Sequence, residues 1–153
     1  MNPNDELSSE RANRIADAVE SIERNVSRLR EVQSLDLEEY KSGANRELRD
    51  ATERKFEKLI EAVLDIAESI LKQEGIDVPS RRKATIESVE TEEVIDTGLA
   101  DRLREAVGFR DVLSHTHGPV VNDDIVYDAV QNSLSRYVEF VEAVDEYLSG
   151  TSP

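Results

Sequence analysis

The sequence predicts an all-α protein, a four- to five-helix up-and-down bundle. Its 153 residues include only four Pro and six Gly, so residues that break helices are rare. Apolar residues recur at steps of three and four between charged ones, the spacing that gives a helix one apolar face. A chain of this length can bury one core. We therefore expect a single helical domain over residues 1–153, with an ordered core from about residue 5 to about residue 148.

The first expected helix runs from about Asp5 to about Gln33. The chain then turns at residues 34–36, where Asp36 and Glu39 have the spacing of a capping box. The apolar seam of this helix consists of Ile15, Val19, Ile22, Val26 and Leu29.

A long second helix follows, with an expected irregularity at residues 41–43. Gly75 is a plausible C-cap, and Pro79 marks the break after it. The next stretch, up to residue 97, is the least regular part, with short helical pieces expected at 84–89 and 92–95. The seam of the second helix consists of Leu48, Thr52, Phe56, Leu59, Val63, Ile66 and Ile70.

A further helix is expected from Gly98 until the stop at Pro119, because proline and the residue before it disfavour helix. Asn122, followed by two aspartates, then caps one last helix. One stripe of the helix from Gly98 carries Leu99, Leu103, Ala106, Arg110 and Leu113. The seam of the last helix consists of Val126, Val130, Leu134, Tyr137, Val141, Val144 and Leu148.

Composition narrows the functional classes. The absence of Cys excludes disulfides and thiolate chemistry. The first residues lack the pattern of a secretory signal, and no apolar run approaches the roughly 18 residues that span a bilayer, so we expect a soluble cytoplasmic protein. The net charge is −15, and the 19 basic residues are 14 Arg and 5 Lys. This balance indicates a halophilic cytoplasm, or alternatively a plain acidic surface.

Any nucleic-acid-binding surface on so acidic a chain must be small, local and built mainly from Arg. The compact basic cluster at residues 81–83 is either a phosphate contact or an ordinary solvated loop.

The candidate chemistry lies at the end of the helix from Gly98. The chain has two histidines, His115 and His117, and histidine is suited to proton transfer near neutral pH. Asp111, four residues before His115, is placed to accept a hydrogen bond from its ring. Arg110 occupies the apolar stripe, where an Arg needs a carboxylate, a phosphate or a wet interface, or else a long stem that reaches the edge of the bundle.

Residues 108–115 read Gly-Phe-Arg-Asp-Val-Leu-Ser-His and resemble the R-x4-H signature of HEPN domains. The fuller phrase, G-F-R-[ND]-x-L-x-H with an aspartate-rich turn and Val126-Tyr127 after it, is similar to the HepT-like toxin branch. The order of elements also agrees over most of the chain.

The resemblance implies a two-fold dimer of helical bundles, with the R-x4-H helices meeting at a shared cleft. It implies a toxin that cleaves RNA without metal or cofactor. By position, Arg110, Asp111 and His115 match the catalytic residues, and Ser114 and His117 are the expected substrate-binding residues. The expected partners are a second copy of the chain, RNA and a cognate minimal nucleotidyltransferase antitoxin. No association with a membrane is expected.

One position departs from the family's pattern. HepT-like proteins typically continue H-x-Y, and that Tyr is the target of AMP transfer by the antitoxin. His117 stands there in this chain, so no modification site is expected at the motif position. Tyr127 is near in sequence but does not match the motif.

Three other interpretations remain open. His115 and His117 could form a metal pair, although residues two apart on a helix point about 200° away from each other and no Cys assists. The chain could be a catalytically silent HEPN module that binds a nucleotidyltransferase or a nucleotide. It could also be a purely structural helical interaction protein.

Overall fold

The computed structural model describes residues 8–115 and 122–150, without the side chains of Ser114 and His115. In this part of the chain all regular structure is helical, as predicted. The elements in order are α1 (Ser9–Val32), α2 (Leu37–Lys41), the 3₁₀ turn η2 (Gly43–Asn45), α3 (Arg46–Gln73), α4 (Arg82–Thr91), α5 (Thr97–His115), α6 (Asp123–Asn132) and α7 (Ser135–Leu148).

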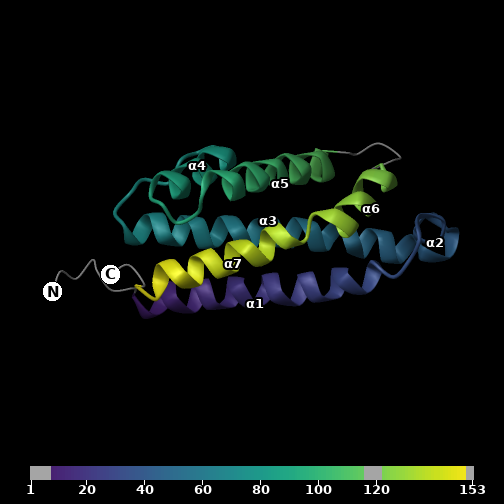
Figure 1. The fold of residues 1–153 in the computed structure, drawn as a ribbon, viewed down its shortest axis with the longest axis horizontal. Helices are drawn as coiled ribbons and strands as arrows, with labels where there is room; N and C mark the ends of the chain where they lie inside the picture. Colours follow the sequence, from purple (N-terminus) through teal and green to yellow (C-terminus); the bar gives the residue numbers. More distant parts are fainter. Residues whose placement is uncertain (1–7, 116–121, 151–153) are drawn as a thin grey trace.

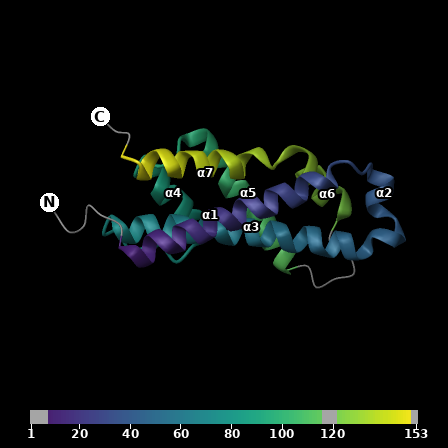
Figure 2. The same ribbon diagram turned by 90° about the horizontal axis from the view of Figure 1, so that it is seen from below.

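The long helices run alternately up and down, which confirms the predicted bundle. Figure 1 shows α1, α3, α5 and α7 along the long axis of the molecule. α1 and α5 each pack against both α3 and α7. Turned by 90°, the molecule shows α3 and α7 on opposite sides of α1 (Figure 2), and the two helices have only a small contact with each other. The start of α1 and the end of α7 lie at the same end of the bundle.

The predicted seams of the first two long helices line the core. Ile22 and Leu29 of α1 and Phe56 and Leu59 of α3 are fully buried, and the two helices pack against each other. A buried Leu or Phe side chain contributes about 1.5–3 kcal/mol relative to an exposed one, so these seams hold the bundle together.

The helix boundaries follow local sequence signals. Asp36 and Glu39 form both hydrogen bonds of the predicted capping box at the start of α2. The expected irregularity at residues 41–43 is the break between α2 and α3, which η2 occupies. Gly75, after the end of α3, has φ +74°, a conformation that a glycine adopts at little cost.

Two helix predictions need correction in the region before α5. Residues 82–91 form one helix, α4, which is longer than the expected piece at 84–89. The expected piece at 92–95 is absent. Glu93 has φ 61°, and the backbone N–H of Val94 donates to Val89 O at 3.0 Å, so the chain reverses at this point instead of continuing as helix.

The last helix was predicted as one, but it breaks at residues 133–134 into α6 and α7. Gln33 Nε2 donates to Val130 O at 2.9 Å and holds α6 on the end of α1. The break moves the buried face of α7, so that Phe140 is buried and the predicted seam residue Val141 is only half-buried.

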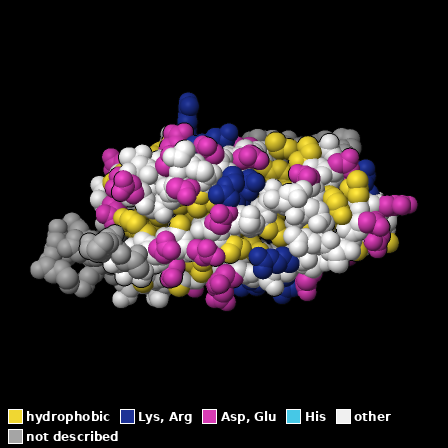
Figure 3. All heavy atoms as spheres, viewed as in Figure 1, with side chains coloured by type: hydrophobic (Ala, Val, Ile, Leu, Met, Phe, Trp, Pro, Cys, Tyr) yellow, Lys and Arg dark blue, Asp and Glu magenta, His cyan; other side chains and the backbone are white. Residues whose placement is uncertain are grey.

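The outer surface is strongly acidic. Figure 3 shows Asp and Glu side chains spread over the face on which α7 lies, with Lys and Arg in a few separate groups. None of the helices in the described residues combines the length and the apolar character that crossing a bilayer requires.

Candidate active site

Arg110 lies on α5 with most of its side chain covered. Leu103, Ala106 and Leu113, which share its stripe, are buried, so Arg110 occupies an apolar position as predicted. Its side chain is 15% exposed. The preceding residue, Phe109, packs edge to face on Phe56 of α3, with the ring centroids 5.3 Å apart.

The guanidinium of Arg110 is only partly satisfied. Its Nη2 donates to Oε1 of Glu61 on α3 at 3.1 Å. Its Nε is buried and has no hydrogen-bond partner in the part of the chain that the structure describes. A buried donor without a partner is costly, so this group is suited to an anion that arrives from outside.

A pocket of about 280 Å³ lies beside Arg110. Helices α3, α4 and α5 and the segment before α4 form its walls, and it contains both members of the Arg110–Glu61 pair. Its other lining residues are Leu64, Asp65, Glu68, Pro79, Ser80, Arg82 and Thr85.

Asp111 forms an ion pair that the sequence did not predict. Nη1 of Arg82, on α4, lies 3.4 Å from Oδ1 of Asp111. The expected partner of Asp111 was the ring of His115, whose side chain is outside the described residues. The contact with Arg82 brings part of the basic cluster at residues 81–83 to the end of α5.

The structure places the other predicted site residues only in part. Ser114 and His115 are the last residues of α5, so Arg110 and His115 lie on one continuous helix. His117, with the expected stop at Pro119, lies outside the described residues. Among the described residues no group of three or more His, Asp or Glu side chains is placed to hold a metal ion.

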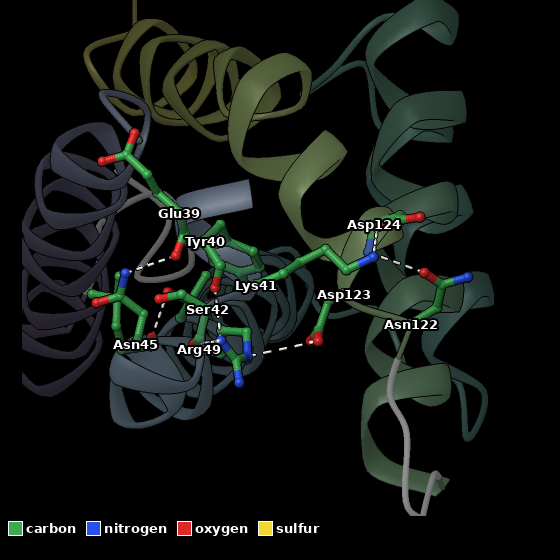
Figure 4. A network of polar contacts seen from close by, with 11 residues as sticks. Glu39, Tyr40, Lys41, Ser42, Asn45, Arg49, Asn122, Asp123 and Asp124 are labelled. Atoms are coloured by element: carbon green, nitrogen blue, oxygen red, sulfur yellow. Dashed lines mark hydrogen bonds and ion pairs between the residues drawn. The ribbon is translucent and has the colours of Figure 1, made fainter. Parts of the chain in front are cut away.

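A polar network anchors the chain just after residues 116–121 (Figure 4). Nη1 of Arg49 donates to the carbonyls of Tyr40 at 2.8 Å and Ser42 at 2.6 Å, and its Nε lies 3.6 Å from Oδ2 of Asp123. Asn122 caps α6 as predicted, by accepting from the N–H of Asp124 at 2.9 Å. The network ties the start of α6 to the break between α2 and α3.

Tyr127 has a structural position in the same region. Its hydroxyl donates to Leu35 O at 2.7 Å, and its ring lies 5.5 Å from the ring of Tyr40. The hydroxyl is therefore engaged in holding α6 against the turn between α1 and α2.

Sequence reasoning missed Glu61, the pairing of Arg82 and the role of Arg49. Glu61 is an exposed charged residue of α3 with no motif around it, so no local signal pointed to it. The basic cluster at residues 81–83 was a signal for Arg82, but its proximity to Asp111 depends on how α4 packs on α5.

The chain matches known proteins over most of its length. A family model described as Ribonuclease HepT-like matches residues 22–144, a span that includes the whole of α5. The mRNA nuclease HepT of Shewanella oneidensis is 25% identical over 130 residues, which cover 85% of this chain and 95% of that protein.

Solved structures with this fold include toxin–antitoxin complexes. A tri-AMPylated HEPN toxin of Shewanella oneidensis, in complex with its MNT antitoxin, matches with a TM-score of 0.76 and 24% identity, over 86% of this chain and 96% of that one. A toxin–antitoxin structure with AMP-PNP matches with a TM-score of 0.73 and 24% identity, over 87% and 98%. The cytosolic protein YutE of Bacillus subtilis, of unknown function, matches with a TM-score of 0.76 and 17% identity, over 92% of each chain. These likenesses confirm the predicted all-helical fold.

Proposed function

The chain belongs to the ribonuclease HepT-like family, and on this premise we propose that it is a metal-independent endoribonuclease, the toxin of a toxin–antitoxin pair. Two comparisons support the proposal. A relative that spans most of the chain is named an mRNA nuclease. The solved structures that share the fold include a HEPN toxin with its antitoxin.

The observation that carries the proposal is the state of Arg110. A guanidinium that is 15% exposed, with an Nε that has no partner in the described residues, lines a pocket on the helix that ends at His115. An arginine in this state is suited to bind a phosphate, because its planar donors match phosphate oxygens.

The chemistry needs no external nucleophile. The 2′-hydroxyl of RNA attacks the adjacent phosphorus, so that an O2′–P bond forms and the P–O5′ bond breaks. One proton leaves the 2′-hydroxyl and another reaches the 5′ oxygen, which leaves as a hydroxyl; the product ends in a 2′,3′-cyclic phosphate. In this proposal His115 transfers a proton and Arg110 stabilises the charge that develops on the phosphate.

The reaction needs both an acid and a base, and the motif supplies one histidine per chain. We infer a two-fold dimer in which the two Arg110–His115 segments face a common cleft. Val112 supports this arrangement, because its apolar side chain is 53% exposed on α5 between those two residues. Positions 112 and 115 are three residues apart and so lie on one side of the helix.

The proposed inhibitor is a small nucleotidyltransferase, as in the solved complex of a HEPN toxin with an MNT antitoxin. His117 stands where the resemblance expects Tyr, and the hydroxyl of Tyr127 is bonded to Leu35 O. Position 117 holds no tyrosine that could accept AMP. We therefore propose that the antitoxin inhibits this chain without transferring AMP at the motif position.

The test is RNA cleavage by the purified protein and its variants in EDTA. Arg110→Ala and His115→Ala are each expected to lower the rate by about 10²–10⁴-fold while the protein stays folded. Asp111→Asn is expected to be milder, because an amide still accepts one hydrogen bond from a ring. The wild-type products are expected to end in 2′,3′-cyclic phosphate.

His117→Ala is the informative comparison, because His117 is an expected substrate contact but the motif does not require it for proton transfer. If His117→Ala is inactive while His115→Ala still cuts, the assignment of the proton-transfer group is wrong. Absence of any cleavage by the wild type, with a partner nucleotidyltransferase still bound, would favour the silent binding module instead.

A further inference from the structure

An open groove of about 780 Å³ lies at the start of α4. Three exposed cations, Arg81, Arg82 and Lys83, line one side of it. No acidic residue occupies the first turn of α4, and no side chain caps this end of the helix. The remaining lining residues are Ser80, Ala84, Glu87, Val107 and Asp111.

The groove borders the pocket beside Arg110. Ser80 and Arg82 line both of them. Arg82 also contacts Asp111, which follows Arg110 directly on α5. A chain of phosphates that reached Arg110 through the pocket would therefore pass the cationic side of the groove.

Two of the three cations are available to a ligand. Arg82 is paired with Asp111, whereas Arg81 and Lys83 form no ion pair within the residues that the structure describes. Lys83 lies over the backbone of α5, because its Nζ is 3.5 Å from the place where a Cβ on Gly108 would stand. Lys83 is thus placed next to the helix that carries Arg110.

The chemistry of the groove favours a polyanion. In a chain of net charge −15, three successive cations on one exposed turn form a local positive region on an acidic surface. Two carboxylates, Glu87 and Asp111, also line the groove, so it is not uniformly positive. Separate phosphates along a flexible strand can contact the cations and avoid the carboxylates.

We propose that this groove binds backbone phosphates of single-stranded RNA on one side of the bond that is cut, with Arg81 and Lys83 as the phosphate contacts. This inference rests on the proposed function, because it assigns a flanking substrate site to the same active site. Arg82 is a positioning residue in this scheme: it orders the boundary between groove and pocket through Asp111.

The decisive variant is Arg81→Gln combined with Lys83→Gln, which leaves the Arg82–Asp111 pair intact. Binding of a fluorescent single-stranded RNA is measured by anisotropy over a range of salt, with His115→Ala as the background so that the RNA is not cut. Loss of two phosphate contacts is expected to make the slope of log K against log salt shallower by about 1.4. The matched control combines Arg30→Gln with Lys72→Gln, two exposed cations that line neither pocket. It should leave the slope unchanged.

Kinetics separate this proposal from the proposed function. In the active background the groove variant should raise KM for long RNA and leave kcat unchanged. An unchanged salt slope together with an unchanged KM overturns the groove while the nuclease proposal stands. If the wild type never cuts RNA, the nuclease proposal fails. The slope of log K against log salt then still tests whether the groove binds RNA. Loss of binding to a nucleotidyltransferase partner with an unchanged RNA slope would make the groove a protein interface and overturn the proposal.

Discussion

Nη2 of Arg110 on α5 donates to Oε1 of Glu61 on α3, 3.1 Å away. The two partners differ in exposure, since the Arg110 side chain is 15% exposed and the Glu61 side chain 59%. The carboxylate is therefore well solvated, and the pair contributes little to stability. Glu61 instead orients a guanidinium that the proposed reaction needs, and its negative charge stands next to the place where a phosphate would bind.

Glu61→Gln is expected to lower KM for RNA and to leave kcat unchanged. The amide oxygen still accepts from Arg110, but the charge that repels phosphate is gone. The expected decrease at low salt is at most about fivefold, since an exposed pair is worth about 1 kcal/mol or less. The measurement is steady-state cleavage kinetics, with Glu23→Gln, an exposed carboxylate of α1, as the control. A higher KM in Glu61→Gln would contradict a repulsive role for Glu61.

Val112→Asp is expected to convert the proposed dimer into a monomer. Its apolar side chain is 53% exposed, and a charge at a buried apolar contact would cost several kcal/mol without a partner. Light scattering coupled to gel filtration at high salt measures the mass. Leu37→Asp, the same change at an exposed apolar residue of α2, is the control. A wild-type protein that is already a monomer would exclude the common cleft.

The melting temperature is expected to fall by several degrees when salt is reduced from molar to about 0.1 M. The screening length grows to about 10 Å at the lower concentration, and the excess of acidic side chains then repels itself. For chains of about this size, 1 kcal/mol corresponds to roughly 2–4 °C. The melting temperature at each salt concentration is measured by recording the circular dichroism signal during thermal unfolding. A Tm that is flat or higher at low salt would refute the halophilic interpretation.

Glu53→Gln is expected to stabilise the protein at neutral pH. Burial raises the pKa of the Glu53 carboxyl above its usual 4.5, and the neighbouring charges of Asp50 and Asp123 raise it further. Because the folded-state pKa lies above the unfolded-state value of 4.5, folding favours the protonated Glu53 carboxyl. The protonated carboxyl therefore contributes its full stabilisation of the folded state below pH 4.5. This stabilisation is lost as the pH rises through the folded-state pKa. The amide does not ionise, so the variant avoids that loss.

The gain from Glu53→Gln is at most about 1 kcal/mol, because water screens the half-exposed carboxyl. Unfolding in denaturant at a series of pH values should show the gain at pH 7 and its disappearance below pH 4.5. Glu23→Gln, at an exposed position, corrects for the general effect of removing one negative charge. An equal gain in both variants would mean that the surroundings of Glu53 have no part in it.

Most of the fold follows from the sequence, because helix formation and capping are local. The seams of α1 and α3, the capping box of Asp36 and Glu39, and the Asn122 cap all appear as predicted. The break between α6 and α7 does not follow from local sequence. It forms where α6 is held by Gln33, a residue 97 positions before its acceptor Val130.

The site divides in the same way. The sequence by itself determined that Arg110 stands on an apolar stripe and lies five residues before His115. The stripe depends only on the 3.6-residue period of a helix, and the spacing is the order of the residues themselves. Only the tertiary structure decided which groups contact Arg110 and its neighbour Asp111. Glu61 lies 49 residues from its partner Arg110, and the two meet because α3 packs against α5. Arg82 lies 29 residues from its partner Asp111, and these two meet because α4 packs against α5. Packing of this kind depends on the shapes of whole helices, so no local pattern in the sequence encodes it.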